Sequence, residues 1–250
     1  MLGYEPALLA IITGAVFIGG IVKGIVGIGL PIVSIAILLN FLPPTVVLAT
    51  VVIPIVATNF WQTFRSGLDL ETFRRFWVMT LTFITFLVVT AHFVVGLDTR
   101  LLFGLLGACV ATFALSNLVK PRATPLEPAT EKWAGPVAGA LGGMLGGIST
   151  IWGPPMMMYL VLLKLPKDVW IRGVGLIWFV GSIPLALSYW ANGILNAETA
   201  PLSLYACLPG LAGIVVGERI RRHVNQETFS RVMLVVLFLI GINLVRRAVS

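Results

Sequence analysis

The chain has 250 residues, of which 58% are hydrophobic and 11% are charged, and its mean hydropathy is +1.00. Because a soluble domain usually carries about a quarter charged residues, this composition predicts an all-α polytopic membrane protein with no separate soluble domain. The long apolar runs argue against a transmembrane β-barrel, which would show short alternating segments. The net charge of +7 does not indicate nucleic acid, because basic residues in short loops orient membrane helices.

Eight apolar stretches follow one another along the chain. They cover 7–39, 45–64, 76–95, 101–119, 134–163, 169–191, 201–217 and 229–245. The first and the fifth are too long for one crossing, since a transmembrane helix needs about 20 residues. Glycine and proline interrupt both of them. Each is therefore either one broken span or a hairpin that returns to its starting side.

The first segment holds the sequence VKGIVGIGLPIV at 22–33, which places Lys23, Gly27, Gly29 and Pro31 among apolar residues. Irregular backbone at membrane depth is tolerated only where it is buried in protein or lines a cavity. We therefore expect the tip near 24–31 to meet a second tip near 148–155 close to the bilayer midplane. Helix ends at such tips present N–H groups that suit an anion.

Three short motifs recur in order in the second half of the chain, which indicates an internal repeat. They pair 29–33 with 153–157, 41–47 with 164–170, and 66–72 with 192–199. We predict a first transmembrane repeat at 1–120, a cytoplasmic linker at 121–133 and a second transmembrane repeat at 134–250. The linker is rich in proline and charge, as exposed connections are.

Loop charge favours the hairpin interpretation. Basic residues gather in 65–75, 119–133, 164–168 and 217–228, whereas 40–44, 96–100 and 191–200 carry little charge. The positive-inside rule places all four basic loops in the cytoplasm only if both long segments are hairpins, with both termini outside. The two halves then have opposite orientation, and such inverted repeats with interrupted helices are typical of transporters.

Several polar residues are candidates for an anion site, and each has a structural alternative. Lys23 offers a positive charge, although a lysine can also snorkel to the interface. Arg65 and Arg172 can bind an oxyanion with paired N–H groups, or can be interfacial arginines. The candidate binding residues are Lys23, Gly27, Gly29, Pro31, Asn59, Gln62, Arg65, Ser149, Thr150, Trp152, Gly153, Pro154, Pro155 and Arg172.

For the amides and hydroxyls the choice is also open. Asn59 and Gln62 lie three residues apart and can donate to an oxyanion or join helices. Ser149 and Thr150 can cradle an anion or cap an irregular turn. No acidic residue falls in the middle of an apolar stretch, which argues against a cation substrate and carboxylate-based ion coupling.

The sequence offers no basis for an enzyme, a metal site or a cofactor. No His/Asp/Glu or Cys/His cluster lies at membrane depth, and Cys109 and Cys207 both sit inside apolar segments. The expected partners are a small anion and the lipid bilayer, and the sequence leaves a homodimer open.

Four motifs resemble the TauE/SafE family of sulfite and organosulfonate exporters. They are GIVGIGLP (24–31), NFWQTFRSG (59–67), GGISTIWGPP (146–155) and RGVGLIWFVGSIP (172–184). The resemblance covers nearly the whole chain and implies a multi-pass transporter of the bacterial inner membrane that exports small organosulfur anions such as sulfoacetate or sulfite. An anion channel of the same architecture is the alternative.

Overall fold

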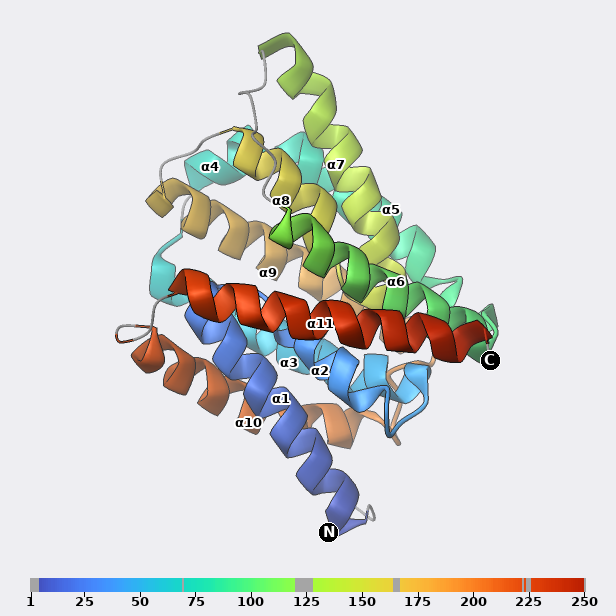
Figure 1. Cartoon of the computed structure of the whole chain (residues 1–250). Helices are drawn as coiled ribbons and strands as arrows, with labels where there is room; N and C mark the ends of the chain where they lie inside the picture. Colours follow the sequence, from blue (N-terminus) through green and yellow to red (C-terminus); the bar gives the residue numbers. More distant parts are fainter. Residues whose placement is uncertain are drawn as a thin grey trace.

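The computed structural model describes residues 5–68, 70–119, 128–163, 167–221, 223 and 226–249, and this part of the chain is helical without strands (Figure 1). In chain order the elements are α1 (Pro6–Val26), α2 (Leu30–Leu38), α3 (Pro44–Ser66), α4 (Leu70–Arg75), α5 (Trp77–Ala91), the 3₁₀ turn η1 (Val94–Gly96), α6 (Thr99–Leu118), α7 (Pro128–Ser149), α8 (Gly153–Leu162), α9 (Lys167–Ala191), α10 (Ala200–Ile220) and α11 (Gln226–Val249).

The predicted apolar stretches all form helix, which confirms the polytopic all-α class. Six helices within the described residues are long and apolar enough to cross a membrane. They are Pro6–Val26, Pro44–Arg65, Trp77–Gly96, Thr99–Ser116, Arg172–Ala191 and Ala200–Ile220. The two overlong stretches each divide into a long and a short helix, α1 with α2 and α7 with α8.

The first break follows from two glycines. Gly27 ends α1 with a φ of 88° and donates its N–H to the Lys23 carbonyl at 2.7 Å. Gly29 precedes α2 with a φ of 115°. Both values lie in the left-handed region, which glycine adopts without steric cost. The chain therefore turns sharply between the two helices.

The short helices fold back along the long ones, so both segments are hairpins. The hydroxyl of Ser34 in α2 donates to the Ala15 carbonyl of α1 at 3.4 Å. In the second half, Tyr159 of α8 lies against Gly135 of α7. The 9 residues of α2 and the 10 of α8 extend for about 14 and 15 Å, roughly half of a bilayer core.

Glycine also sets the closest helix pairs. A Cβ on Gly20 or Gly24 of α1 would collide with the backbone of α10, and one on Gly143 or Gly147 of α7 would collide with α5. Small residues let membrane helices approach this closely. Gly20 and Gly24 lie 123 positions before Gly143 and Gly147, which is the offset of the predicted repeat.

The helix directions follow from these contacts. α1 runs parallel to α10 and α5 runs parallel to α7, whereas α3 is antiparallel to α9 and α6 to α11. Figure 1 shows α6 and α11 lying side by side. These directions are the ones that an inverted repeat requires. The repeat itself and its boundaries at 1–120 and 134–250 stay predictions.

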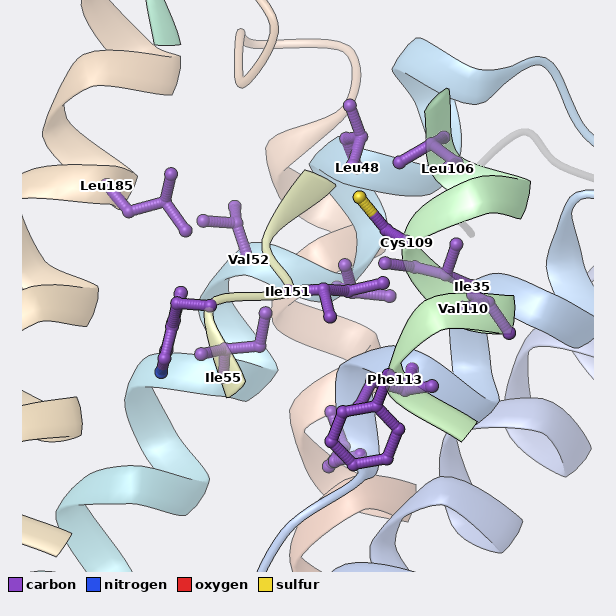
Figure 2. Close-up of a cluster of buried hydrophobic side chains, with 14 of the residues drawn as sticks. Ile35, Leu48, Val52, Ile55, Leu106, Cys109, Val110, Phe113, Ile151 and Leu185 are labelled. Atoms are coloured by element: carbon purple, nitrogen blue, oxygen red, sulfur yellow. The ribbon is translucent and has the colours of Figure 1, made fainter. Parts of the chain in front are cut away.

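The buried core reaches the second hairpin tip. Figure 2 shows Ile151, in the link between α7 and α8, lying between Ile55 of α3 on one side and Val110 and Phe113 of α6 on the other. All four side chains are at most 1% exposed. Helices of the first half therefore hold this non-helical link of the second half in place.

Candidate functional site

A cavity of about 30 Å³ lies where the two hairpin tips meet. The first tip contributes Gly29 and Pro31, and the second contributes Thr150, Trp152 and Gly153. The other lining residues are Lys23, Ile28, Ile32, Ile55, Asn59, Phe113, Ile151 and Trp178. Residues far apart in the sequence thus enclose one site, and seven of them were predicted as binding residues.

Lys23 is the charged side chain of the cavity. It is only 4% exposed, and its ammonium donates to Thr58 Oγ1 at 3.1 Å and to Asn59 Oδ1. No described carboxylate forms an ion pair with it. A buried charge without a counter-charge is costly. An anion in the cavity would supply that counter-charge.

Lys23 lies in the apolar stretch 7–39, directly before the first hairpin tip. Because Gly27 ends α1, Lys23 occupies the last turn of that helix. Long side chains of a helix lean toward its N-terminus. The ammonium therefore reaches inward to α3, where it is buried.

Asn59 links three helices at the cavity. Its Oδ1 accepts from Lys23 of α1, and its Nδ2 donates to the Trp178 carbonyl of α9 at 3.3 Å. Its own carbonyl accepts from Thr63 Oγ1 at 2.9 Å. Both ends of the amide are therefore engaged with protein. Asn59 positions the lysine, and the second N–H of its Nδ2 can still donate to an anion.

Two polar groups of the cavity lining lack a partner. Within the described residues, the buried atoms Thr150 Oγ1 and Trp178 Nε1 make no hydrogen bond, and outside the cavity the same holds for Trp61 Nε1. Buried polar side-chain atoms nearly always have a partner. Two residues that line the cavity together with Lys23 thus each carry a buried donor without a partner.

Thr150 also has a strained backbone. Its φ of 60° makes it the non-glycine residue with a left-handed conformation in the described chain. Such conformations cost roughly 1–3 kcal/mol and persist where the surroundings enforce them. Here the Thr150 N–H still completes α7 by donating to the Gly146 carbonyl at 2.8 Å. The conformation turns the chain from α7 toward the cavity.

The helix ends contribute less than the sequence suggested. α2 begins at the cavity with no side-chain cap, and α8 begins there at Gly153. The N-terminal dipoles of both helices favour an anion. However, Pro31, Pro154 and Pro155 occupy first-turn positions and have no N–H to donate. The side chains of the cavity therefore offer more hydrogen-bond donors than the proline-containing first turns of α2 and α8 do.

Ser149 matches the structural alternative. Its hydroxyl donates to the Leu145 carbonyl at 2.7 Å and accepts from the Ile151 N–H at 3.1 Å. It is fully buried and does not line the cavity. The serine thus caps the end of α7 and holds the link to α8.

The remaining predicted residues lie outside the cavity. Arg65 pairs with Glu218 of α10 at 3.0 Å and lies over the Trp61 ring. Arg172 is exposed near the start of α9. Gln62 lies near Gly175 of α9. Gly27 ends α1, Pro155 belongs to the first turn of α8, and the side chain of Pro154 is outside the described part of the chain.

The sequence interpretation missed two polar residues of the site. Trp178 was not among the candidate binding residues, although it lies inside one of the four family-like motifs. Its ring packs edge-on against Trp152, with 6.4 Å between centroids. Thr58 directly precedes the predicted Asn59 and shares its contact with Lys23. Periodicity alone does not distinguish such residues from core residues.

Comparison with known proteins identifies the family. The family description "Sulfite exporter TauE/SafE" matches residues 12–244, which is nearly the whole chain. No curated protein and no solved structure matches this chain. The match spans both hairpins and the cavity between them. The chain therefore belongs to the TauE/SafE sulfite exporter family.

Proposed function

We propose that this membrane anion transporter exports small organosulfur anions across the bacterial inner membrane, with sulfoacetate and sulfite as the leading substrates. The observation that carries the proposal is the buried ammonium of Lys23, which faces a cavity and has no described carboxylate as partner. The family supports transport of sulfite or related anions. The choice of organosulfur substrates comes from the same resemblance.

The donors of the cavity define its selectivity. An ammonium, a hydroxyl and an indole N–H can each donate to a separate oxygen of a sulfonate or sulfite group. Charge-assisted hydrogen bonds of this kind are the strong ones. A cationic amine would meet Lys23 and be repelled. We expect a doubly anionic sulfonate to bind better than zwitterionic taurine of similar size.

The cavity is small compared with the proposed substrates. A volume of about 30 Å³ accommodates roughly two water molecules and no sulfonate group. Substrate binding therefore requires the hairpin tips or the flanking helices to separate. We propose that the two inverted repeats move against each other for this purpose, as transporters of that architecture do.

Export does not require a coupling ion. Moving one negative charge out of a negative-inside cell gains about 2.3 kcal/mol per 100 mV. The described helices place no carboxylate at the cavity that would bind a coupling cation. A uniporter driven by membrane potential and substrate gradient is therefore the simplest mechanism.

Flux through purified protein in liposomes tests the proposal. Sulfite, sulfoacetate, sulfate and a cationic amine should be loaded on one side and followed on the other. We expect saturable flux of the sulfur anions, counterflow on addition of unlabelled substrate, and no amine transport. Flux that rises linearly with concentration and shows no counterflow would favour the anion channel. Preferred transport of the amine would contradict the anion site.

A further inference from the structure

A second and larger cavity lies between the first turns of α5 and α7. Its volume is about 440 Å³. It shares no lining residue with the cavity at the hairpin tips. Met156 of α8 is fully buried and lies in the sequence between Trp152, which lines the first cavity from the link before α8, and Tyr159, which lines the second. The second cavity is thus a separate feature with chemistry of its own.

The lining of this cavity carries an excess of positive charge. Arg75 and Lys132 contribute two cations, and Glu131 is the carboxylate among the lining residues. Glu131 is already engaged, because its Oε1 pairs with Arg75 Nη2 at 2.7 Å. A guanidinium has five N–H donors, so Arg75 keeps others for a ligand. The Tyr159 hydroxyl completes the polar wall.

Exposed apolar side chains continue from the cavity along both helices. Trp77 and Leu81 of α5 are 57% and 54% exposed, and Trp133 and Val137 of α7 are 77% and 55% exposed. Spacings of four residues place each pair on one helix face. On a membrane helix such a face contacts acyl chains, and tryptophan gathers at the level of lipid headgroups.

Two observations thus coincide, a cavity with two cationic side chains and an adjoining exposed apolar surface that carries two tryptophans. We propose that this cavity binds the phosphate of an anionic phospholipid, with Arg75 and Lys132 as its cationic contacts. The acyl chains would lie along the exposed faces of α5 and α7. Basic pockets between transmembrane helices recognise phosphate headgroups through the same combination of charge and position.

A substrate anion is the weaker candidate for the cavity. A small hydrophilic anion gains nothing from Val78, which lines the cavity and is 37% exposed, or from the apolar faces beyond it. A lipid uses both the charge and the apolar surface. The lipid assignment does not depend on the proposed transport activity, and it can fail or hold independently of that activity.

Lipid binding to the purified protein in detergent tests the assignment. Phosphatidylglycerol and phosphatidylcholine should be titrated separately and bound lipid counted by native mass spectrometry. We expect wild type to prefer phosphatidylglycerol. Arg75→Gln and Lys132→Gln should each weaken phosphatidylglycerol binding about fivefold. Phosphatidylcholine binding should not change.

Arg74→Gln is the matched control, since Arg74 is exposed on the same short helix and does not line the cavity. It should leave lipid binding unchanged. Lys132→Gln preserves the Arg75–Glu131 ion pair, so it remains informative if the Arg75 variant fails to fold. Equal losses of phosphatidylglycerol binding in Arg75→Gln, Lys132→Gln and Arg74→Gln would overturn the proposed site. So would the absence of a headgroup preference, or equally tight binding of free glycerol phosphate.

Discussion

The hydroxyl of Ser203 in α10 donates a hydrogen bond to the Thr50 carbonyl of α3 at 3.1 Å. Thr50 lies four residues before Pro54, which has no N–H to donate to that carbonyl. The same hydroxyl accepts from the Ile53 N–H at 3.2 Å. A side chain of the second half thus satisfies two backbone groups at the proline in α3, one to two turns before Asn59 and the cavity.

Ser203→Ala should therefore destabilise the protein more than loss of an ordinary serine hydroxyl does. The Thr50 carbonyl is left without its donor in a buried region, at a cost of about 1–3 kcal/mol. Thermal unfolding in detergent measures the effect. Ser182→Ala is the control, because the Ser182 hydroxyl is equally buried and, among the described residues, bonds to the Phe179 carbonyl of its own helix and to no other helix. An equal change in both variants would show that Ser203 has no special role.

The glycine contact between α1 and α10 gives a second stability prediction. Gly20→Ala should lower stability by about 1–3 kcal/mol, since the added methyl group collides with the Gly210 carbonyl and forces the helices apart. Gly14→Ala is its control in the same helix. No atom lies within 4 Å of a Cβ at Gly14. Alanine there should be neutral or gain up to about 1 kcal/mol.

The order of the two melting temperatures checks this prediction. If Gly20→Ala melts at or above the temperature of Gly14→Ala, α1 and α10 do not pack as described. A third variant, Gly143→Ala, probes the α5–α7 pair, where the methyl group would meet the Phe83 carbonyl. Its melting temperature should fall by about as much as that of Gly20→Ala if the α1–α10 and α5–α7 contacts are equivalent.

Much of the fold could be predicted because the length of each apolar stretch and the charge of the adjoining loops identify membrane helices. Those signals gave the helical segments and the two hairpins. The helix α4 was missed because its six residues are short and carry Glu71, Arg74 and Arg75, so they read as a basic loop. This helix lies directly before α5, and its own residues show no apolar periodicity.

The site was harder to predict because its partners come from distant parts of the chain. Lys23 lies inside the apolar stretch 7–39, whereas Arg65 begins the basic loop 65–75. This difference favours Lys23 as the buried residue, but it does not reveal that Arg65 pairs with Glu218 or that Lys23 lines a cavity. Trp178 likewise differs from packing tryptophans because it lines the cavity and its buried indole N–H has no partner in the described chain.

Topology has a direct test by cysteine labelling from outside the cell. Cys109 and Cys207 should first be replaced by alanine to give a background without thiols. We then expect cysteine at position 98 or 198 to be labelled by an impermeant reagent, and cysteine at 122 or 221 to be protected. Strong external labelling at both 122 and 221 would contradict the predicted orientation and the inverted repeat with it.

Lys23→Met tests the counter-charge role. The variant should fold, since removal of a buried charge relieves a desolvation cost. Sulfite or sulfonate affinity should fall by about 1.5–3 kcal/mol, the size of a charge-assisted hydrogen bond. Lys23→Arg should retain part of the affinity because the charge survives in a different geometry. Isothermal titration with a thermal melt as folding control measures both quantities.

Arg172→Met is the matched control for the lysine. Arg172 is exposed and lies outside the cavity. Its substitution should leave affinity unchanged if the described cavity is the binding site. Unchanged affinity in Lys23→Met together with a loss in Arg172→Met would move the anion site to the exposed end of α9.

Thr150→Val separates binding from stability most sharply. Valine has the shape of threonine without the hydroxyl, and that hydroxyl is buried and without a partner in the described structure. Its removal should leave stability unchanged or raise it by about 1 kcal/mol, because an unsatisfied polar group is no longer buried. Anion affinity should fall by about 0.5–1.5 kcal/mol through loss of one neutral donor.

Thr63→Val serves as the control for Thr150→Val. The Thr63 hydroxyl already donates to the Asn59 carbonyl at 2.9 Å, so its removal should lower stability. A Thr150→Val variant that is destabilised while it binds sulfite like wild type would show that the hydroxyl supports the fold and not the substrate.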